Sequence, residues 1–274
     1  MSLRLSAIGI IGRNPTAALR MINDPLFYAA AVPAVILVGL AKGGFSGLGL
    51  LSLPLMALAV SPVQAAAIML PILMIQDVVT VWAYRRTWDG RNLARLLPGA
   101  ALGIVLGWVL AAKVSDHAVE LVIGVVSITF AVRRLVLERG GRLPPASRPG
   151  RLAGWFWGGV SGFTSMVAHA GGPPFQVYVM PQRLPREVFV GTGAMFFAVV
   201  NWIKVPPYLA LGQLNTENLS TSLALFPLAI AATWAGVWLV RRVPTKGFYT
   251  AVYCLLVLVG GRLVWEGVRG LAGG

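Results

Sequence analysis

The chain has 274 residues, of which 57% are hydrophobic and only 12% are charged, and its formal net charge is +14. Soluble domains carry roughly 25% charged residues, so this composition excludes an ordinary soluble protein and predicts a membrane protein with about eight to ten passes of roughly 20 apolar residues each. The basic residues lie in short loops between apolar runs, as the positive-inside rule predicts, and this distribution excludes a nucleic-acid-binding domain.

The predicted elements fall into two sets separated by a basic linker. The apolar segments of the first set are residues 27–41, 47–60, 63–84, 96–112 and 117–132. Those of the second set are residues 152–167, 175–180, 188–210, 219–240 and 248–264. Residues 139–151, rich in Arg, Pro and Gly, form the linker. In each set the first two segments are separated by a glycine-rich break.

The two sets have the features of an internal duplication. An offset of about 123 residues aligns Gly49 with Gly172, and a slightly longer offset aligns Asn92 with Asn218. The sequence therefore predicts an N-terminal repeat over residues 1–138, which begins with a short surface segment, the linker 139–151, and a C-terminal repeat over residues 152–274.

Each interrupted segment has pieces of about 14 to 16 residues, or roughly 21–24 Å of helix, which is less than the roughly 30 Å hydrocarbon core. Such a segment is either a re-entrant hairpin or two thin passes, and both return the chain to its starting side. Each half then crosses the bilayer an odd number of times. The predicted fold is an all-α integral membrane protein with two inverted repeats, each with one interrupted segment and three full transmembrane helices.

The loop charges predict an orientation. The side that holds the linker collects about twice as many basic residues as the other, so we expect the linker 139–151 in the cytoplasm and both termini outside, in a bacterial cytoplasmic (inner) membrane.

The first break, residues 42–49, carries a buried charge. A lysine within the bilayer is costly and marks function by default, so Lys42 predicts an anion site; the alternative is that it reaches the interface or pairs structurally with Asp77. The glycines allow a turn and a close approach of ligand, and the half-helix expected to begin near Gly49 would direct its N–H groups at an anion. A hydroxyl donor would come from Ser46 or Ser52.

The second break, residues 168–174, contains His169 and is followed by a helix expected to begin near Pro173. A histidine titrates near neutral pH and would couple anion movement to protons. A structural hydrogen bond is the alternative interpretation of this side chain.

Few other polar residues lie within the spans. Asp77 is either the partner of Lys42 or a proton carrier, and Lys204 either binds the anion or anchors its helix at an interface. The predicted substrate-binding residues are Lys42, Gly43, Gly44, Ser46, Gly49, His169, Gly171, Gly172, Gln176, Asn201 and Lys204, and the predicted coupling or charge-pair residues are Gln76, Asp77 and His169.

At these residues the chain resembles the TauE/SafE sulfite exporter family, also called the toluene sulfonate uptake permeases. The matching stretches are residues 41–89, which begin AKGGFSGLG, and residues 169–212, which begin HAGGPPFQ. The resemblance implies transport of sulfite, organosulfonates or related small anions. It also implies that Lys42, both breaks, His169, Asn201 and Lys204 belong to the family pattern, although Phe45, Ser46 and Leu48 make the first break poorer in glycine than in many members.

The function expected from this reasoning is a secondary transporter and exporter of small sulfur-containing anions, working by alternating access around a midplane site and driven by the membrane potential or a proton gradient. The single cysteine, Cys254, and two distant histidines argue against an enzyme, a metal site or a cofactor. The alternatives are a channel or scaffold subunit and a transporter of another small organic anion.

Overall fold

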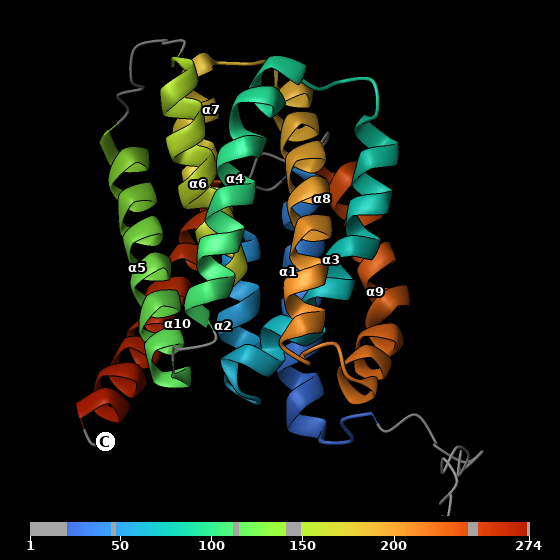
Figure 1. Cartoon of the computed structure of the whole chain (residues 1–274), viewed down its shortest axis with the longest axis vertical. Coiled ribbons are helices and arrows are strands. Elements are labelled where there is room, and N and C mark those ends of the chain that lie inside the picture. Colours follow the sequence, from blue (N-terminus) through green and yellow to red (C-terminus); the bar gives the residue numbers. More distant parts are fainter. Residues whose placement is uncertain (1–20, 45–47, 112–114, 141–148, 241–245, 273–274) are drawn as a thin grey trace, which may run out of the picture.

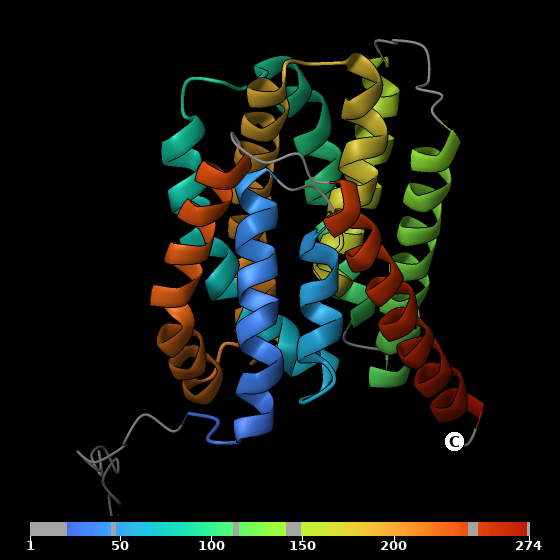
Figure 2. The same cartoon turned by 180° about the vertical axis from the view of Figure 1, so that it is seen from behind.

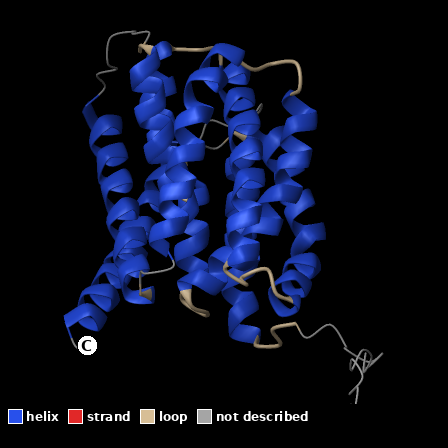
Figure 3. Ribbon diagram, viewed as in Figure 1, coloured by secondary structure: helices blue, strands red, loops and turns tan. Residues whose placement is uncertain are grey.

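The computed structural model of the protein describes residues 21–44, 48–111, 115–140, 149–240 and 246–272. All regular elements of these residues are helices (Figure 3), so the predicted all-α class is confirmed. Five helices are long and apolar enough to cross a membrane: Pro25–Gly43, Pro62–Tyr84, Gly90–Leu110, Arg186–Ala210 and Thr216–Leu239. The protein is therefore a multi-pass membrane protein. The expected N-terminal surface segment lies outside the described residues.

The helices follow the two predicted sets (Figure 1). The first set is α1 (Pro25–Gly43), η1 (Leu48–Leu51), α2 (Ser52–Met56), α3 (Pro62–Tyr84), α4 (Gly90–Ala111) and α5 (Asp116–Gly140). The second set is α6 (Arg151–Ala168), α7 (Gly172–Val179), η2 (Met180–Gln182), α8 (Arg186–Ala210), α9 (Thr216–Val240) and α10 (Lys246–Ala272).

Capping signals explain where the helices beside the first break begin. The Asp24 side chain accepts a hydrogen bond from the Leu26 N–H, and the Ser61 side chain accepts one from the Gln64 N–H, so each caps a helix whose first turn carries a proline. A proline at this position loses no helical hydrogen bond, since the first N–H groups of a helix have no partner within it.

The two interrupted segments have unequal pieces, which corrects the predicted length. α1 has 19 residues and α6 has 18, whereas η1 and α2 have four and five and α7 has eight. Each long helix continues until a residue with positive φ, Gly44 at 130° after α1 and His169 at 49° after α6, reverses the chain. The apolar run alone underestimated α1 because this helix extends through Lys42 and Gly43, beyond the last apolar residue.

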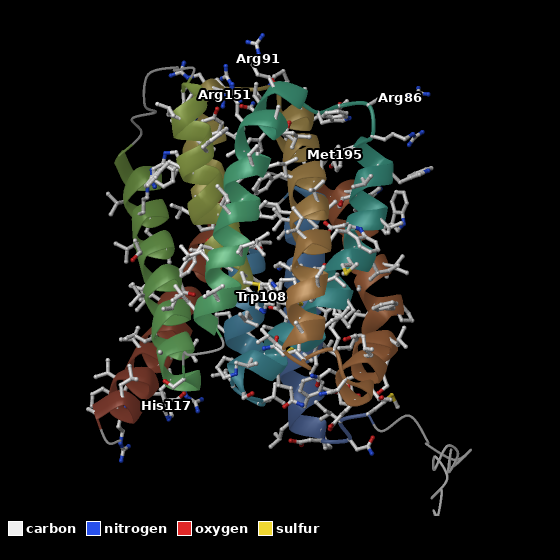
Figure 4. All side chains as sticks on the ribbon, in the orientation of Figure 1. Arg86, Arg91, Trp108, His117, Arg151 and Met195 are labelled. Carbon is white, nitrogen blue, oxygen red and sulfur yellow. The ribbon has the colours of Figure 1, made fainter. Side chains whose placement is uncertain are left out.

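The two hairpins enter from opposite ends of the molecule. Figure 4 places Arg86, Arg91 and Arg151 at one end, which we call the arginine-rich end, and His117 at the other. Figures 1 and 2 show that α1 starts at the end opposite the arginine-rich end and that α2 runs back toward this starting end. In contrast, α6 starts at the arginine-rich end and α7 runs back toward the arginine-rich end. Accordingly, α3 and α8 run in opposite directions, as do α4 and α9.

Close helix packing holds the hairpins in place. α1 packs against α9 and α6 packs against α4, so each hairpin contacts a helix of the other half. A Cβ at Gly43 would lie 2.2 Å from the Gly236 carbonyl carbon, and one at Gly103 would lie 2.0 Å from the Gly159 carbonyl oxygen. Such contacts between small residues let transmembrane helices approach closely.

The outer surface is apolar, as a bilayer requires. Large side chains of four helices are more than half exposed there, namely Trp82, Leu102, Trp202 and Trp265. Cys254 is also exposed, on α10.

Candidate anion site

The two breaks border one cavity of about 150 Å³. This volume is below the roughly 300–1,000 Å³ typical of pockets for drug-sized ligands, so the cavity suits a small solute. Seven of the predicted site residues line it: Lys42, Gly44, Gly49, His169, Gly172, Gln176 and Asn201. Residues 130 positions apart in the chain thus meet here because the two hairpins reverse at neighbouring places inside the helix bundle.

Lys42 forms an ion pair with Asp77 of α3 at the wall of the cavity. The two side chains are 11% and 4% exposed. The second carboxylate oxygen of Asp77 accepts a hydrogen bond of 2.6 Å from the Asn201 amide, so both oxygens have a partner. A buried charge is tolerated when it is paired and hydrogen-bonded in this way. The Lys42 charge is therefore balanced by a fixed acid.

Lys204 of α8 lies behind the second break and is fully buried. Its Nζ atom is 2.7 Å from Nδ1 of His169 and donates to the Ser165 carbonyl oxygen at 3.3 Å. In the described part of the chain, no ion pair connects Lys204 with a carboxylate. Unlike Lys42, this lysine has a base rather than an acid as its side-chain partner.

The contacts of His169 define its tautomer. Its Nε2 atom is 2.9 Å from the Ala66 carbonyl oxygen of α3. A carbonyl oxygen only accepts, so Nε2 carries the hydrogen, and Nδ1 of the neutral ring accepts from Lys204. The ring stacks on Tyr208, with centroids 6.2 Å apart and planes 22° apart. The imidazole therefore joins the end of α6 to both α3 and α8.

The remaining predicted residues lie beside the cavity or beyond it. Gly43 faces α9, and its carbonyl oxygen accepts from the Tyr84 hydroxyl at 2.9 Å. The Gly171 carbonyl oxygen accepts from the Ser161 hydroxyl at 2.7 Å, and the Gln76 amide donates to the Val35 carbonyl oxygen at 3.4 Å. Asp77 and Lys204 do not line the cavity, but they contact the lining residues Lys42 and His169. Ser46 lies outside the described residues.

Helix ends contribute fewer donors than the sequence predicted. Pro173 and Pro174 have no N–H group, and the Phe175 N–H already donates to the Gly171 carbonyl oxygen at 3.3 Å. At the first break the chain resumes as a four-residue 3₁₀ helix at Leu48, and α2 begins only at Ser52. Side-chain charges and amides therefore carry more of the attraction for an anion than backbone dipoles do.

An aromatic wall was not predicted from the sequence. Phe175, Phe189 and Phe197 line the cavity, and the Phe175 ring packs 5.5 Å from that of Phe197 and 6.1 Å from that of Phe189. Ser165 is a further lining residue that sequence reasoning missed. No local pattern distinguishes these side chains from lipid-facing or core residues, because only the helix packing turns them toward the breaks.

A small cavity lined by Lys42 and His169, inside a bundle of membrane-spanning helices, is typical of solute transporters. A family model described as "Sulfite exporter TauE/SafE" matches residues 31–263, and the chain belongs to this family. No curated protein and no solved structure matches the chain. The family is one of membrane transporters of sulfur-containing anions and not of enzymes, so the protein is a membrane transport protein for a small anion.

Proposed function

We propose that the protein is a secondary transporter that exports small sulfur-containing anions, such as sulfite or organosulfonates, across the bacterial cytoplasmic membrane. The anion binds in the cavity between the two breaks, and alternating access exposes this site to each side in turn. The observation that carries the proposal is the position of Lys42, His169 and Asn201, from three helices, around one cavity of about 150 Å³.

The charges around the cavity favour an anion. Lys42 and Asp77 cancel, and the Lys204–His169 pair, when it holds a proton, gives the site one net positive charge. Attraction between charges is strong in a site with few water molecules, where the effective dielectric constant is low. The aromatic wall of Phe175, Phe189 and Phe197 favours an anion with an apolar portion. Transport of an organosulfonate, or of another small organic anion, should therefore be compared with transport of sulfite.

Inverted repeats provide the geometry for alternating access, with the repeats at residues 1–138 and 152–274. The opposite directions of the hairpins and of α3 and α8 support this arrangement (Figures 1 and 2). Asp77 and Asn201 are 124 positions apart, close to the offset of the duplication, and they bond to each other. Equivalent residues meet in this way where a two-fold axis passes between their helices.

Hydrogen bonds between the halves show a similar correspondence between the two repeats. The Asn92 amide donates to Gln182 at 3.1 Å and accepts from it at 3.0 Å, next to the end of α7. Its counterpart Asn218 accepts from Gln64 at 3.3 Å, at the start of α3 after α2. Each asparagine thus bonds to a glutamine that follows the hairpin of the other half.

The orientation places the arginine-rich end and the linker 139–151 in the cytoplasm, with both termini outside. Phe189, Val190 and Gly193 line the cavity from the first turns of α8, which starts at the arginine-rich end, so the cavity extends toward the cytoplasm. An exporter takes up its substrate from that side. For an anion that crosses without an accompanying proton, the cell-negative potential favours exit by about 2.3 kcal/mol per charge per 100 mV.

Flux measurements with purified protein in liposomes test the proposal. We expect saturable flux of sulfite and of methanesulfonate or benzenesulfonate, with little flux of benzoate. The variant Lys42→Ala should lower the flux at least about tenfold, since Asp77 then faces the cavity unbalanced. The matched control Arg262→Ala removes an exposed cation that pairs with Glu266 and should transport like the wild type. Flux that does not saturate, or equal flux in Lys42→Ala, would contradict the proposal.

A further inference from the structure

The contact between Lys204 and His169 contains an unusual constraint on protons. Only one hydrogen fits on the 2.7 Å line between Nζ and Nδ1. The other ring nitrogen, Nε2, already donates to the Ala66 carbonyl oxygen. If an ammonium and an imidazolium were both present, two N–H groups would point at each other. The pair therefore holds one positive charge or none, and the proton of the charged form lies with either nitrogen.

Among the described residues, no acid lies at contact distance from the pair. The charged groups close enough to act on it are Lys42 and Asp77, which form their own ion pair. From α8, Tyr208 stacks on the imidazole, and its hydroxyl donates to the Met166 carbonyl oxygen at 3.3 Å. From α6, only the Ser165 carbonyl oxygen reaches the ammonium. The net charge of the site is thus set by the occupancy of a single proton.

The position of the pair connects this proton with the anion. His169 lines the cavity whereas Lys204 does not, so the imidazole lies between the buried amine and the cavity. With the proton present the site has one net positive charge, and without it the site is neutral. An anion in the cavity stabilises the charged form, and by linkage the proton strengthens anion binding by the same factor.

We propose that Lys204 and His169 together form the proton-binding site of the transporter, taking up one proton from the cavity when the anion binds and releasing it when the anion leaves. This inference rests on the proposed function, because it describes how a proton regulates anion binding at the same site. The step is a proton transfer only: water supplies H⁺ to the neutral Lys204–His169 pair, and no electron is exchanged. Lys204 is a positioning residue for the charge, and His169 lies between it and the anion.

Calorimetric titration in detergent with methanesulfonate tests the inference, since this anion stays fully ionised where histidine titrates. Repeating the titration in buffers with different ionisation enthalpies gives the number of protons taken up per anion. For the wild type we expect affinity to fall as the pH rises, with up to one proton taken up per anion on the alkaline side. The control Arg262→Ala should give the same profile.

Three variants separate a proton site from a structural contact. Lys204→Met leaves the imidazole as the only base of the pair, and an imidazole is a weaker base than an amine. This variant should therefore lower the affinity at least about tenfold at alkaline pH and confine proton uptake to lower pH than in the wild type. Lys204→Arg keeps a permanent cation and should bind methanesulfonate with no proton uptake. His169→Gln retains a donor for Ala66 and an acceptor for Lys204, so it should fold and yet shift the pH dependence of the affinity.

The outcomes distinguish this inference from the proposed function. Wild-type binding with a pH-independent affinity and a buffer-independent enthalpy would overturn the proton site while leaving the transporter proposal in place. Lys204→Met with wild-type affinity and proton uptake would do the same. Failure of the wild type to bind any sulfur oxyanion at any pH would overturn both.

Discussion

The first and second breaks border the same cavity but treat a buried lysine differently. At the first break, Lys42 is balanced by Asp77, whose other oxygen is held by Asn201. At the second, Lys204 contacts the neutral His169, so its charge is not cancelled. The difference teaches that one break holds a lysine in a neutral ion pair, whereas the other holds a lysine whose partner is a base, so that in the proposed transporter only the second pair changes the net charge of the site.

The two breaks also differ in how closely neighbouring atoms approach one of their glycines. Gly43 packs directly against the Gly236 backbone of α9, so the start of the first break lies in close contact with a neighbouring helix. Gly172 has open space around it, with the Gln176 amide 3.8 Å from a Cβ built there. Gly43 therefore has no room for a side chain, whereas Gly172 has room for one.

The largest expected effect follows from removing the acid of the first break. Asp77→Ala removes the counter-ion of the nearly buried Lys42 ammonium. Breaking a buried ion pair in this way lowers the free energy of unfolding by about 3–5 kcal/mol. Thermal unfolding in detergent should show a clearly lower midpoint. The double variant Lys42→Met/Asp77→Leu should recover most of the stability while losing anion binding. A wild-type midpoint in Asp77→Ala would mean that the ion pair does not hold the first break.

A smaller effect separates the two glycines. Gly43→Ala places a methyl group 2.2 Å from the Gly236 carbonyl carbon, and overpacking of this kind costs about 1–3 kcal/mol. Gly172→Ala meets no atom closer than 3.8 Å and should change stability by less than about 0.5 kcal/mol. The same unfolding assay checks both variants. Equal losses of stability in the two variants would contradict the difference in packing between Gly43 and Gly172.

A third comparison concerns the amide contacts between the halves. Asn92→Ala removes two reciprocal hydrogen bonds with Gln182 and leaves that amide partly unsatisfied, which costs about 1–3 kcal/mol. Gln64→Ala removes one longer bond to Asn218 and should cost about 1 kcal/mol or less. Limited proteolysis of the folded protein should detect the first variant more readily than the second. The reverse order would indicate that α3 and α9, rather than α4 and η2, depend on these amides.

Sequence signals defined the breaks because glycine, proline and capping residues act locally. The expected start near Pro173 lies one residue from the observed start of α7 at Gly172, and Ser61 caps α3 beside Pro62. The lengths of the pieces were less accessible, since α1 ends at a residue with positive φ and not at the last apolar residue.

Contacts that depend on the packing of distant helices were harder to derive. The Lys42–Asp77 pair was one of two interpretations of Asp77, because it joins residues 35 positions apart on separate helices. The contact of Lys204 with His169 was not accessible, although Lys204 was one of the predicted substrate-binding residues. Its neighbours Val205, Pro206 and Pro207 indicated a helix end at an interface, whereas α8 continues through both prolines to Ala210 and buries the lysine against His169.

A thermal-shift screen of the purified protein tests the central claim, that the cavity between the breaks is an anion site anchored by Lys42. Sulfite, sulfate, thiosulfate, methanesulfonate and acetate are compared, with Lys42→Ala in parallel. A ligand at 100 times its dissociation constant stabilises the folded state by about 2.7 kcal/mol. We predict stabilisation of the wild type by sulfite or methanesulfonate and none in Lys42→Ala. Equal stabilisation of both proteins, or none of the wild type by any sulfur oxyanion at millimolar concentration, would contradict the claim.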